Sequence, residues 1–344
     1  MEEWKEYRLG EITVMKNGKK RPQEKGLYPV YGGNGIMDYS NNYNSEKVII
    51  VGRVGAYCGC VYKYDEKCWV SDNAIAVTPK DTVDFHFLYY LMSTLDLHHH
   101  HIGGAQPLMT QDIIGDFKIK LPSPKVQQQI VSVLKSLDDK IEVNRRINDN
   151  LEQQAMAIFD MMFPAVVSGE DVIGNVITPK RGKGLLSKDA LEGNVPVVAG
   201  GLEPATYHNE SNTVAPVVTI SASGANAGFV NLWQIPVWSS DSSFIDASMT
   251  ENVYFWYVML KKRQKEIFDA QTGSAQPHIY PKHIAEMPMG NFEQSDVEKF
   301  TEIVTPMFEI RGRNLKESER LASLRDTLLP KLMSGELKLN EINV

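Results

Sequence analysis

The chain has 344 residues, of which 42% are hydrophobic and 23% are charged, and its formal net charge is −7. This length is sufficient for two domains that each bury a core. A net negative charge argues against a protein that coats nucleic acid non-specifically, although it leaves room for local basic loops. Three cysteines (Cys58, Cys60 and Cys68) are an odd count that fits no disulfide framework.

Membrane and export signals are not expected. The first ten residues, MEEWKEYRLG, contain no basic region followed by an apolar stretch, so the sequence predicts no signal peptide. The most apolar segment, residues 155–167, is too short to span a bilayer and contains Asp160 and Pro164. We therefore expect a soluble, cytoplasmic protein.

The globular parts of the chain are predicted to mix strands and helices. Short β-rich runs, among them VIIV (48–51), AIAV (74–77), PVVTI (216–220) and FVNLW (229–233), alternate with Gly- and Asn-rich turns. Strand pairs are expected to turn at VGAYCG and SGANAG, where glycine can adopt a positive φ. One helix is predicted at residues 84–97 and another at residues 251–268.

A long helix is predicted at residues 123–163, bounded by prolines near both ends. Its apolar residues are spaced alternately by four and three when two asparagines are included, which is the seam of a coiled coil. The seam consists of Ile130, Leu134, Leu137, Ile141, Asn144, Asn148, Leu151, Ala155, Ile158 and Met162.

A second long helix is predicted at residues 291–335, with a poorer seam and with Pro306 expected to kink or interrupt it. That seam consists of Phe300, Val304, Met307, Arg311, Asn314, Ser318, Leu321 and Leu328. If the two helices pair antiparallel, Asn144 and Asn314 are expected to face each other and to fix the register. Chance placement of polar residues on a seam is the alternative.

The chain reads as a duplication. IGGAQP (102–107) matches TGSAQP (272–277), and other segments align at nearly the same offset: LGEITVMKNGKKRP with IGNVITPKRGKGLL, YPVYGG with VPVVAG, and WVSD with WSSD. Because both order and spacing persist, the sequence predicts two copies of one unit.

These patterns predict an α+β fold, in which a mixed α/β globular domain is duplicated in tandem and two long antiparallel coiled-coil helices separate the copies. The expected boundaries are a first globular domain at 1–122, a long helix at 123–163, a second globular domain at 164–290, a second long helix at 291–335 and a tail at 336–344.

Motifs for catalysis, metals and cofactors were not found. The sequence has no phosphate-cradling GxxxxGK[ST] string, no dinucleotide fingerprint and no Asn-Pro-Pro-aromatic motif of amino-methyltransferases. Four consecutive histidines (98–101) cannot converge on one ion from a strand or a helix. The cysteines align with the apolar residues Ala227, Phe229 and Val237. We therefore expect them to be small buried side chains of the core and not zinc ligands. His278 aligns with Leu108, which argues against a shared catalytic histidine. We expect no metal and no cofactor.

Both copies carry a short basic loop before the first strand. Solvated charge clusters are common, but recurrence in two diverged copies favours phosphate contact. The candidate residues are Lys16, Lys19, Lys20 and Arg21 in the first copy and Lys180, Arg181 and Lys183 in the second.

If the chain binds DNA, polar loop residues are candidates for base or backbone contacts. They are Arg53, Tyr57, Gln106, Asn226 and Gln276. The two glutamines could instead cap a turn, which we favour. The loops differ most between the copies, as expected for two domains that are built alike but read different targets.

Taken together, LGEI with NGK, the strand pairs that turn at GxxxG, the GxAQP loop and the helix from LPSPKVQQQI to IFDMMF resemble a specificity subunit of a type I restriction-modification system. The C-terminal segment ESERLASLRDTLLPKLMSGEL resembles that family's second repeat helix.

This resemblance implies two target recognition domains that each contact one half of a bipartite double-stranded DNA target, with the helices acting as a ruler. It also implies two DNA adenine methyltransferase subunits docked on the helices, and restriction subunits. The S-adenosylmethionine and ATP chemistry belongs to these partners, so the chain itself would be non-catalytic. Arg145, Arg146, Asp138 and Asp139 would form docking faces or simply be solvated. The alternatives are a two-domain interaction scaffold or RNA adaptor, and an enzyme with an unrecognised site.

Overall fold

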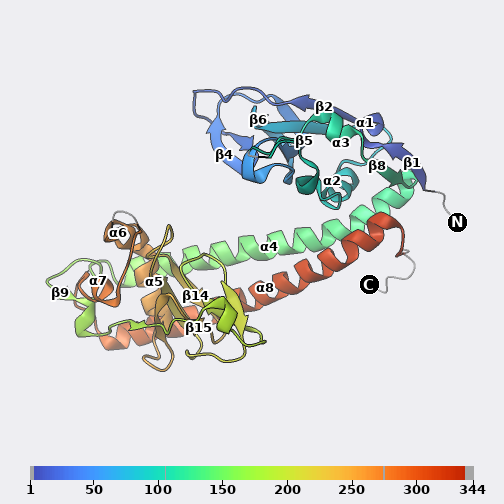
Figure 1. Ribbon diagram of the computed structural model, residues 1–344. Helices are drawn as coiled ribbons and strands as arrows, with labels where there is room; N and C mark the ends of the chain where they lie inside the picture. The colour runs from blue at the N-terminus through green and yellow to red at the C-terminus, as the bar shows by residue number, and fades with distance from the viewer. Residues whose placement is uncertain (1–3, 105, 274–275, 338–344) are drawn as a thin grey trace. The chain divides into compact units, whose positions relative to one another are not determined.

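The computed structural model describes residues 4–104, 106–273 and 276–337. Contacts divide the chain into unit 1 (Met1–Ile141 with Glu319–Val344) and unit 2 (Glu142–Ser318). Each unit holds one globular part and a portion of each of the two longest helices, α4 (Pro124–Met162) and α8 (Gln294–Ser334) (Figure 1). The five-part domain division remains a prediction, and most of its C-terminal tail lies outside the described residues.

The globular part of unit 1 is built on a six-stranded sheet. In the order of the sheet, its strands are β2 (Thr13–Asn17), β7 (Ala74–Pro79), β5 (Ser45–Gly52), β6 (Val61–Val70), β3 (Tyr28–Gly32) and β4 (Gly35–Ser40). Neighbouring strands are antiparallel except β3 and β6, which are parallel. A separate pair joins β1 (Lys5–Arg8) to β8 (Lys118–Leu121).

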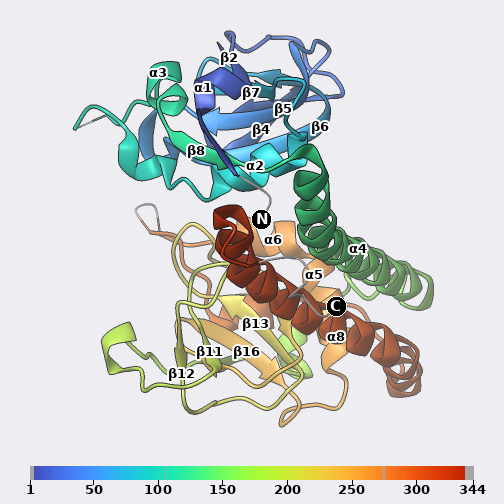
Figure 2. The same ribbon diagram turned by 90° about the vertical axis from the view of Figure 1, so that its right-hand side faces the viewer.

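Unit 2 repeats these pairings with shorter strands (Figure 2). One sheet contains β10 (Lys180–Arg181), β16 (Ser242–Asp246), β13 (Val217–Ser221) and β14 (Val230–Trp233). Another contains β12 (Thr206–His208), β11 (Val195–Val198) and β15 (Trp238–Ser239), and β17 (Pro288–Met289) pairs with β9 (Asp171–Val172).

The match extends to strand direction. The parallel pair of β3 with β6 has its counterpart in the parallel pair of β11 with β15. The long strand β6 corresponds to two strands in unit 2, β14 and β15, because the chain between them contains Pro236, which has no amide hydrogen to donate to a ladder. The duplication is therefore a duplication of topology as well as of sequence.

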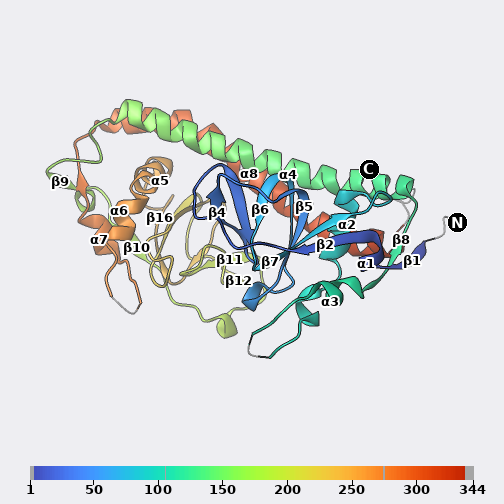
Figure 3. The ribbon, with the colours of Figure 1, turned by 90° about the horizontal axis from the view of Figure 1, so that it is seen from above.

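The shorter helices pack around these sheets. Unit 1 contains α1 (Leu9–Ile12), η1 (Gly55–Tyr57), α2 (Phe85–Ser93), η2 (Leu97–His100) and α3 (Gln111–Gly115). Unit 2 contains η3 (Ile173–Asn175), η4 (Ser187–Asp189), α5 (Val253–Lys262), α6 (Gln264–Asp269) and α7 (Pro281–Ala285). In Figure 3, α1 and α3 lie together, and a Cβ atom added at Gly10 would lie 3.3 Å from the Cα of Gly115.

Both predicted short helices differ from the structure in extent. The helix predicted at 84–97 ends at Ser93, and the helix predicted at 251–268 is divided into α5 and α6 at Arg263. Arg263 is buried at this point. Its guanidinium donates to the carbonyl of Pro288 at 2.7 Å and pairs with Glu266 at 2.5 Å, so its charge is satisfied.

Each unit has its own hydrophobic core. In unit 1, one face of the sheet (Ile49, Val51, Ile75 and Val77) packs on α2 and on both long helices. In unit 2, the corresponding face packs on α5 and on an aromatic cluster formed by Phe159, Phe163, Phe255 and Phe300.

The long helices run antiparallel within each unit. In unit 1, Asp138 of α4 pairs with Arg325 of α8, and in unit 2, Asn148 bonds to Asn314 while Glu152 lies beside Arg311. The predicted seam of α4 is followed as far as Ala155, after which Phe159 and Phe163 are buried in place of Ile158 and Met162. Pro306 does not interrupt α8, which is continuous through that position.

Candidate nucleic-acid interface

In unit 1, the basic segment is held against the C-terminal end of β6. The amide of Lys19 donates to the carbonyl of Val70 at 3.0 Å, and the indole of Trp69 donates to the carbonyl of Lys19 at 3.1 Å. A Cβ atom at Gly18 would lie 1.9 Å from the carbonyl oxygen of Ser71, so only glycine permits this approach. With the backbone fixed, the side chains of Lys16, Lys19, Lys20 and Arg21 are exposed.

Unit 2 repeats the same construction. The amide of Lys183 donates to the carbonyl of Ser239 at 2.9 Å, and the indole of Trp238 donates to the carbonyl of Lys183 at 2.8 Å. A Cβ atom at Gly182 would lie 2.5 Å from the Ser239 carbonyl oxygen. The side chains of Lys180, Arg181 and Lys183 are exposed. In both copies, therefore, a tryptophan holds the lysine that follows a glycine.

The charges of these segments are only partly neutralised within the protein. Arg21 lies 3.6 Å from Asp38, and Arg181 pairs with Asp241 at 2.7 Å. The lysines (Lys16, Lys19, Lys20, Lys180 and Lys183) form no ion pair with a carboxylate among the described residues. Exposed, unpaired ammonium groups are suited to contact phosphate.

The GxxxG loop lies beside the WxSD segment in each unit. In unit 1, the amide of Arg53 donates to the carbonyl of Asn73 at 2.9 Å, and its guanidinium donates to the carbonyl of Asp72 at 3.2 Å. Tyr57 follows Gly55, whose φ is +73°, and is 51% exposed. In unit 2, the amide of Ala222 donates to the carbonyl of Asp241 at 3.0 Å, and Asn226, at the position of Tyr57, is half-buried.

The AQP loop completes the arrangement. Its ends are closed by paired backbone bonds, between Ile102 and Leu108 in unit 1 and between Thr272 and His278 in unit 2. It is joined to the GxxxG loop by the amide of Gly55, which donates to the carbonyl of Pro107 at 3.1 Å. The corresponding bond from Gly224 to Pro277 has the same length.

The two AQP glutamines, Gln106 and Gln276, are exposed. Neither side-chain amide forms a hydrogen bond with a residue that the structure describes, so the turn-capping role that we favoured is not seen there.

Backbone contacts thus join these segments into one continuous surface in each unit. We call the surface of residues 16–21, 53–59, 69–73 and 106–108 the rim of unit 1, and that of residues 180–183, 222–228, 238–241 and 276–278 the rim of unit 2. The twelve predicted DNA-contact residues lie on these rims, seven in unit 1 and five in unit 2, counting Lys16 near the end of β2 and Lys180 in β10. No observation shows that they contact DNA, and their role stays a prediction.

Some residues of the rims were not predicted from the sequence. Trp69 and Trp238 were visible in the WVSD and WSSD match, but their spacing alone gave no sign that their indoles hold Lys19 and Lys183. His278 differs from its counterpart Leu108, and this difference argues against a shared catalytic histidine without indicating a place on the rim.

The cysteines and the histidine run have structural surroundings. Cys58 and Cys68 are buried, and burial raises the pKa of Cys58 and raises that of Cys68 to about 12. His98 bonds through Nδ1 to the carbonyl of Cys58 at 2.7 Å. Among the described residues, no three His, Cys, Asp or Glu side chains form a group able to hold a metal ion.

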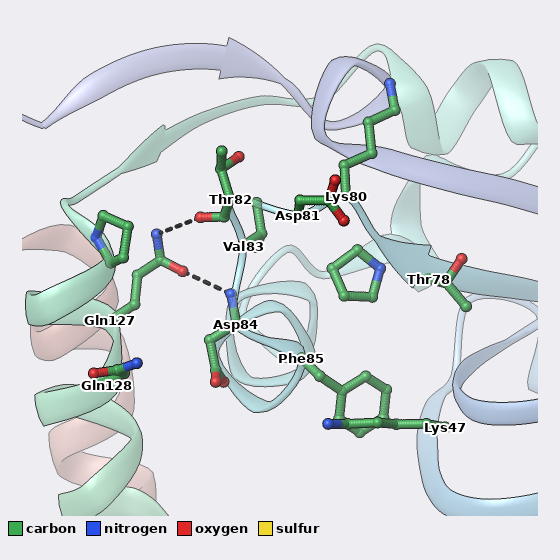
Figure 4. Close-up of a pocket in the computed structure, with 12 residues that line it drawn as sticks. Lys47, Thr78, Lys80, Asp81, Thr82, Val83, Asp84, Phe85, Gln127 and Gln128 are labelled. Atoms are coloured by element: carbon green, nitrogen blue, oxygen red, sulfur yellow. Dashed lines mark hydrogen bonds between the residues drawn. The ribbon is translucent and has the colours of Figure 1, made fainter.

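A pocket of about 480 Å³ in unit 1 lies where the globular part meets the start of α4 (Figure 4). Gln127 of α4 is fully buried beside it: its oxygen accepts from the amide of Asp84 at 2.9 Å, and its nitrogen donates to the carbonyls of Thr82 (3.4 Å) and Pro122 (3.0 Å). Because Gln127 is satisfied within the protein, it anchors the helix to the globular part.

One of the residues expected on a docking face, Asp138, forms contacts within unit 1 instead. Asp138 lies in the packing of unit 1, where it accepts from the hydroxyl of Tyr90 at 2.5 Å and pairs with Arg325 at 2.8 Å. It is therefore not part of a free helix surface, whereas Asp139, Arg145 and Arg146 are exposed. Within the ranges that the structure describes, no helix is both long and apolar enough to cross a membrane.

Two copies of one α+β unit, each with a basic rim and a share of two paired helices, define a duplicated recognition scaffold. Residues 1–153 match the family described as "Type I restriction modification DNA specificity domain". The type I restriction enzyme MjaIX specificity subunit of Methanocaldococcus jannaschii is 26% identical over 77% of this chain and 72% of its own length. The putative type I specificity subunit S.MpnORF638P of Mycoplasma pneumoniae is 24% identical over 96% of both chains.

Among solved structures, the S subunit of a type I restriction-modification system from M. genitalium has the same fold, with a TM-score of 0.62 and 21% identity over 96% of both chains. The α+β fold class with its tandem duplication is thereby confirmed, and so is the resemblance drawn from the sequence. Residues 1–153 thus match the type I restriction-modification DNA specificity family, and most of the chain is similar to specificity subunits of type I systems.

Proposed function

We propose that this chain is the subunit that gives a type I restriction-modification complex its DNA sequence specificity, with each unit recognising one half of a bipartite target in double-stranded DNA. The observation that carries the proposal is the pair of rims, which share their backbone construction while their exposed side chains differ. A common scaffold with different side chains is what two domains need to read two different half-sites.

Each rim offers two kinds of contact. The unpaired lysines are suited to phosphates, which fix the register of a protein on the duplex but carry no sequence information. Arg53, Tyr57 and Gln106 in unit 1, and Asn226 and Gln276 in unit 2, are suited to contact base edges or the backbone. Arg181 takes part less strongly, since Asp241 already neutralises much of its charge.

The helices α4 and α8 set the spacing of the half-sites and carry docking faces for two DNA adenine methyltransferase subunits, with restriction subunits completing the complex. The catalytic activities lie in those partners, and the complex acts in the cytoplasm. Exposed charged residues on α4, such as Asp139 and Arg146, are candidates for the docking face.

The direct test is a map of adenine methylation in the source genome with and without this gene. Loss of one asymmetric motif with a fixed internal gap, restored by the wild-type gene, is the expected result. An unchanged map, with the methyltransferase expressed and active, would contradict the specificity role and favour the interaction scaffold.

The ruler role has its own test. Because α4 and α8 are paired, seven residues are added to both helices at the same level, after Ile141 and after Ser318. One heptad preserves the seam and nearly preserves the helical phase. It adds about 10 Å, so the gap in the methylated motif should lengthen by about three base pairs at about 3.4 Å each. A gap of unchanged length would contradict the ruler.

A further inference from the structure

A stacked aromatic pair distinguishes the rim of unit 2 from that of unit 1. The rings of His278 and Tyr280 lie nearly parallel, with an interplanar angle of 14° and centroids 5.9 Å apart. Tyr280 is 41% exposed and His278 is half-buried. Neither residue was among the contacts predicted from the sequence.

The pair is attached to the surface that carries the other candidate contacts. His278 closes the AQP loop by two backbone bonds with Thr272 and forms a β-bridge with Ser223. The hydroxyl of Ser223 donates to the carboxylate of Asp241, which pairs with Arg181. A short series of contacts therefore connects the backbone of His278 to the basic segment of unit 2.

The fold does not require these aromatic residues. Unit 1 has the same backbone bonds at this place, with Leu108 where unit 2 has His278. The position of Tyr280 is held in unit 1 by Thr110, whose hydroxyl accepts from the amide of Ile113 at 3.2 Å and caps α3.

The tyrosine hydroxyl does not replace that bond. α7 begins at Tyr280 without a cap bond from the tyrosine side chain, and its first turn is closed instead by Nδ1 of His283, which accepts from the amide of Tyr280. A large aromatic residue that is half in solvent, at a position where a small polar residue would stabilise the helix, indicates a role outside folding.

The tyrosine ring is also held in place on a second side. It contacts the ring of His283 at 5.5 Å with an interplanar angle of 70°, and the amide of Tyr280 donates to Nδ1 of His283 at 3.3 Å. Partial burial lowers the pKa of His283, which favours the neutral ring that this bond requires. Fixing the ring before binding reduces the entropy lost when it makes a contact.

We propose that His278 and Tyr280 contact DNA and help to set the base preference of the half-site that unit 2 reads. This inference rests on the proposed function. The imidazole nitrogens and the phenol hydroxyl can each donate or accept a hydrogen bond. Stacking presents these polar groups together at the rim, beside Gln276, whereas unit 1 has only Leu108 and Thr110 at the same place.

The test replaces the pair with the residues of unit 1, in the double variant His278→Leu/Tyr280→Thr. Since unit 1 folds with leucine and threonine on the same backbone, the variant should keep the thermal unfolding temperature of the wild type or exceed it slightly. The assembled complex is then measured for its affinity for a duplex with the mapped motif, and its methylation motif is mapped again.

We expect affinity for the mapped duplex to fall by about tenfold or more, because one well-placed base contact is worth about 1–3 kcal/mol. Discrimination should be lost at positions in one half-site only, with the other half-site read as before. Tyr280→Phe keeps the ring and removes the hydroxyl, so it separates the hydroxyl contact from the stacking.

An unchanged affinity and motif in the folded double variant would overturn the role of the pair while leaving the proposed function intact. Equal losses in both half-sites would overturn it as well, since they would indicate a general effect on assembly. If the wild-type complex does not prefer the mapped duplex over an unrelated duplex, the proposed function itself fails.

Discussion

Asn314 donates a hydrogen bond of 2.9 Å to the side-chain oxygen of Asn148, four residues along α4 from Asn144, which the duplication makes its equivalent. Asn144 is buried, and its amide reaches Glu317 at 2.8 Å and the backbone carbonyl of Asn314 at 3.5 Å. The asparagines therefore meet as expected from the seam, but displaced by one seam position.

Replacing Asn314 by alanine should destabilise unit 2 by about 1–3 kcal/mol, because the oxygen of the buried Asn148 loses its partner. The double variant Asn148→Leu/Asn314→Leu should recover this loss or exceed it, since both polar groups are removed together. Chemical denaturation of the single and double variants measures both effects. Additive losses in the double variant would show that the pair is not coupled.

Replacing Asp138 by asparagine should destabilise unit 1 by about 1–3 kcal/mol, because a partly buried Arg325 loses its charged partner. Burial and the bond to Asp138 both raise the pKa of Tyr90, so its hydroxyl stays a donor. The matched control is Asp139→Asn, one residue along the same helix, whose pair with Lys135 is exposed and should contribute little. Equal losses in thermal unfolding would contradict the assignment.

Replacing Trp69 and Trp238 by phenylalanine should weaken DNA binding by several-fold, because the carbonyls of Lys19 and Lys183 lose the donors that hold the basic segments. Each lost bond should cost about 1 kcal/mol of stability. Trp233→Phe is the control, since its indole bonds to Thr219 and not to a basic segment. The expectation is wrong if the control lowers the affinity for DNA as much as the double variant does.

Thiol labelling at pH 8 should find one fast cysteine, Cys60, because Cys58 and Cys68 are buried. Burial raises the pKa of Cys68 from 9.0 to about 12, so the folded state favours its neutral thiol. That contribution to stability is present below pH 9 and is lost as the pH rises towards 12. Fast labelling that persists in Cys60→Ser would show that another thiol is accessible.

Much of the fold could be predicted because two signals agreed. The offset between the copies showed the duplication, and the spacing of apolar residues showed the two long helices. The ends of the elements were harder to predict. The predicted helix is divided at Arg263, whose guanidinium bonds to the carbonyl of Pro288, and Pro288 is distant in sequence. Near the C-terminal end of α4, the buried positions shift from the predicted seam to Phe159 and Phe163. These two residues belong to the aromatic cluster of unit 2.

The candidate interface was predictable only as a set of separate loops. Repetition pointed to Lys19 and Lys183, but the contacts that join each basic segment to the GxxxG and AQP loops are long-range backbone bonds. His278 and Tyr280 could not be predicted from the repeat. A repeat identifies residues that the two copies share, and these two residues occur in only one copy.

The division of the chain has a consequence for the order in which it folds during synthesis. Unit 2 is one uninterrupted segment, whereas the core of unit 1 includes Leu332 and Met333 of α8. The ribosome therefore releases every residue of unit 2 before it has made the last part of unit 1. Unit 1 therefore begins to be translated first but is completed last. Until α8 is complete, the surface that Leu332 and Met333 cover stays exposed to solvent and to chaperones.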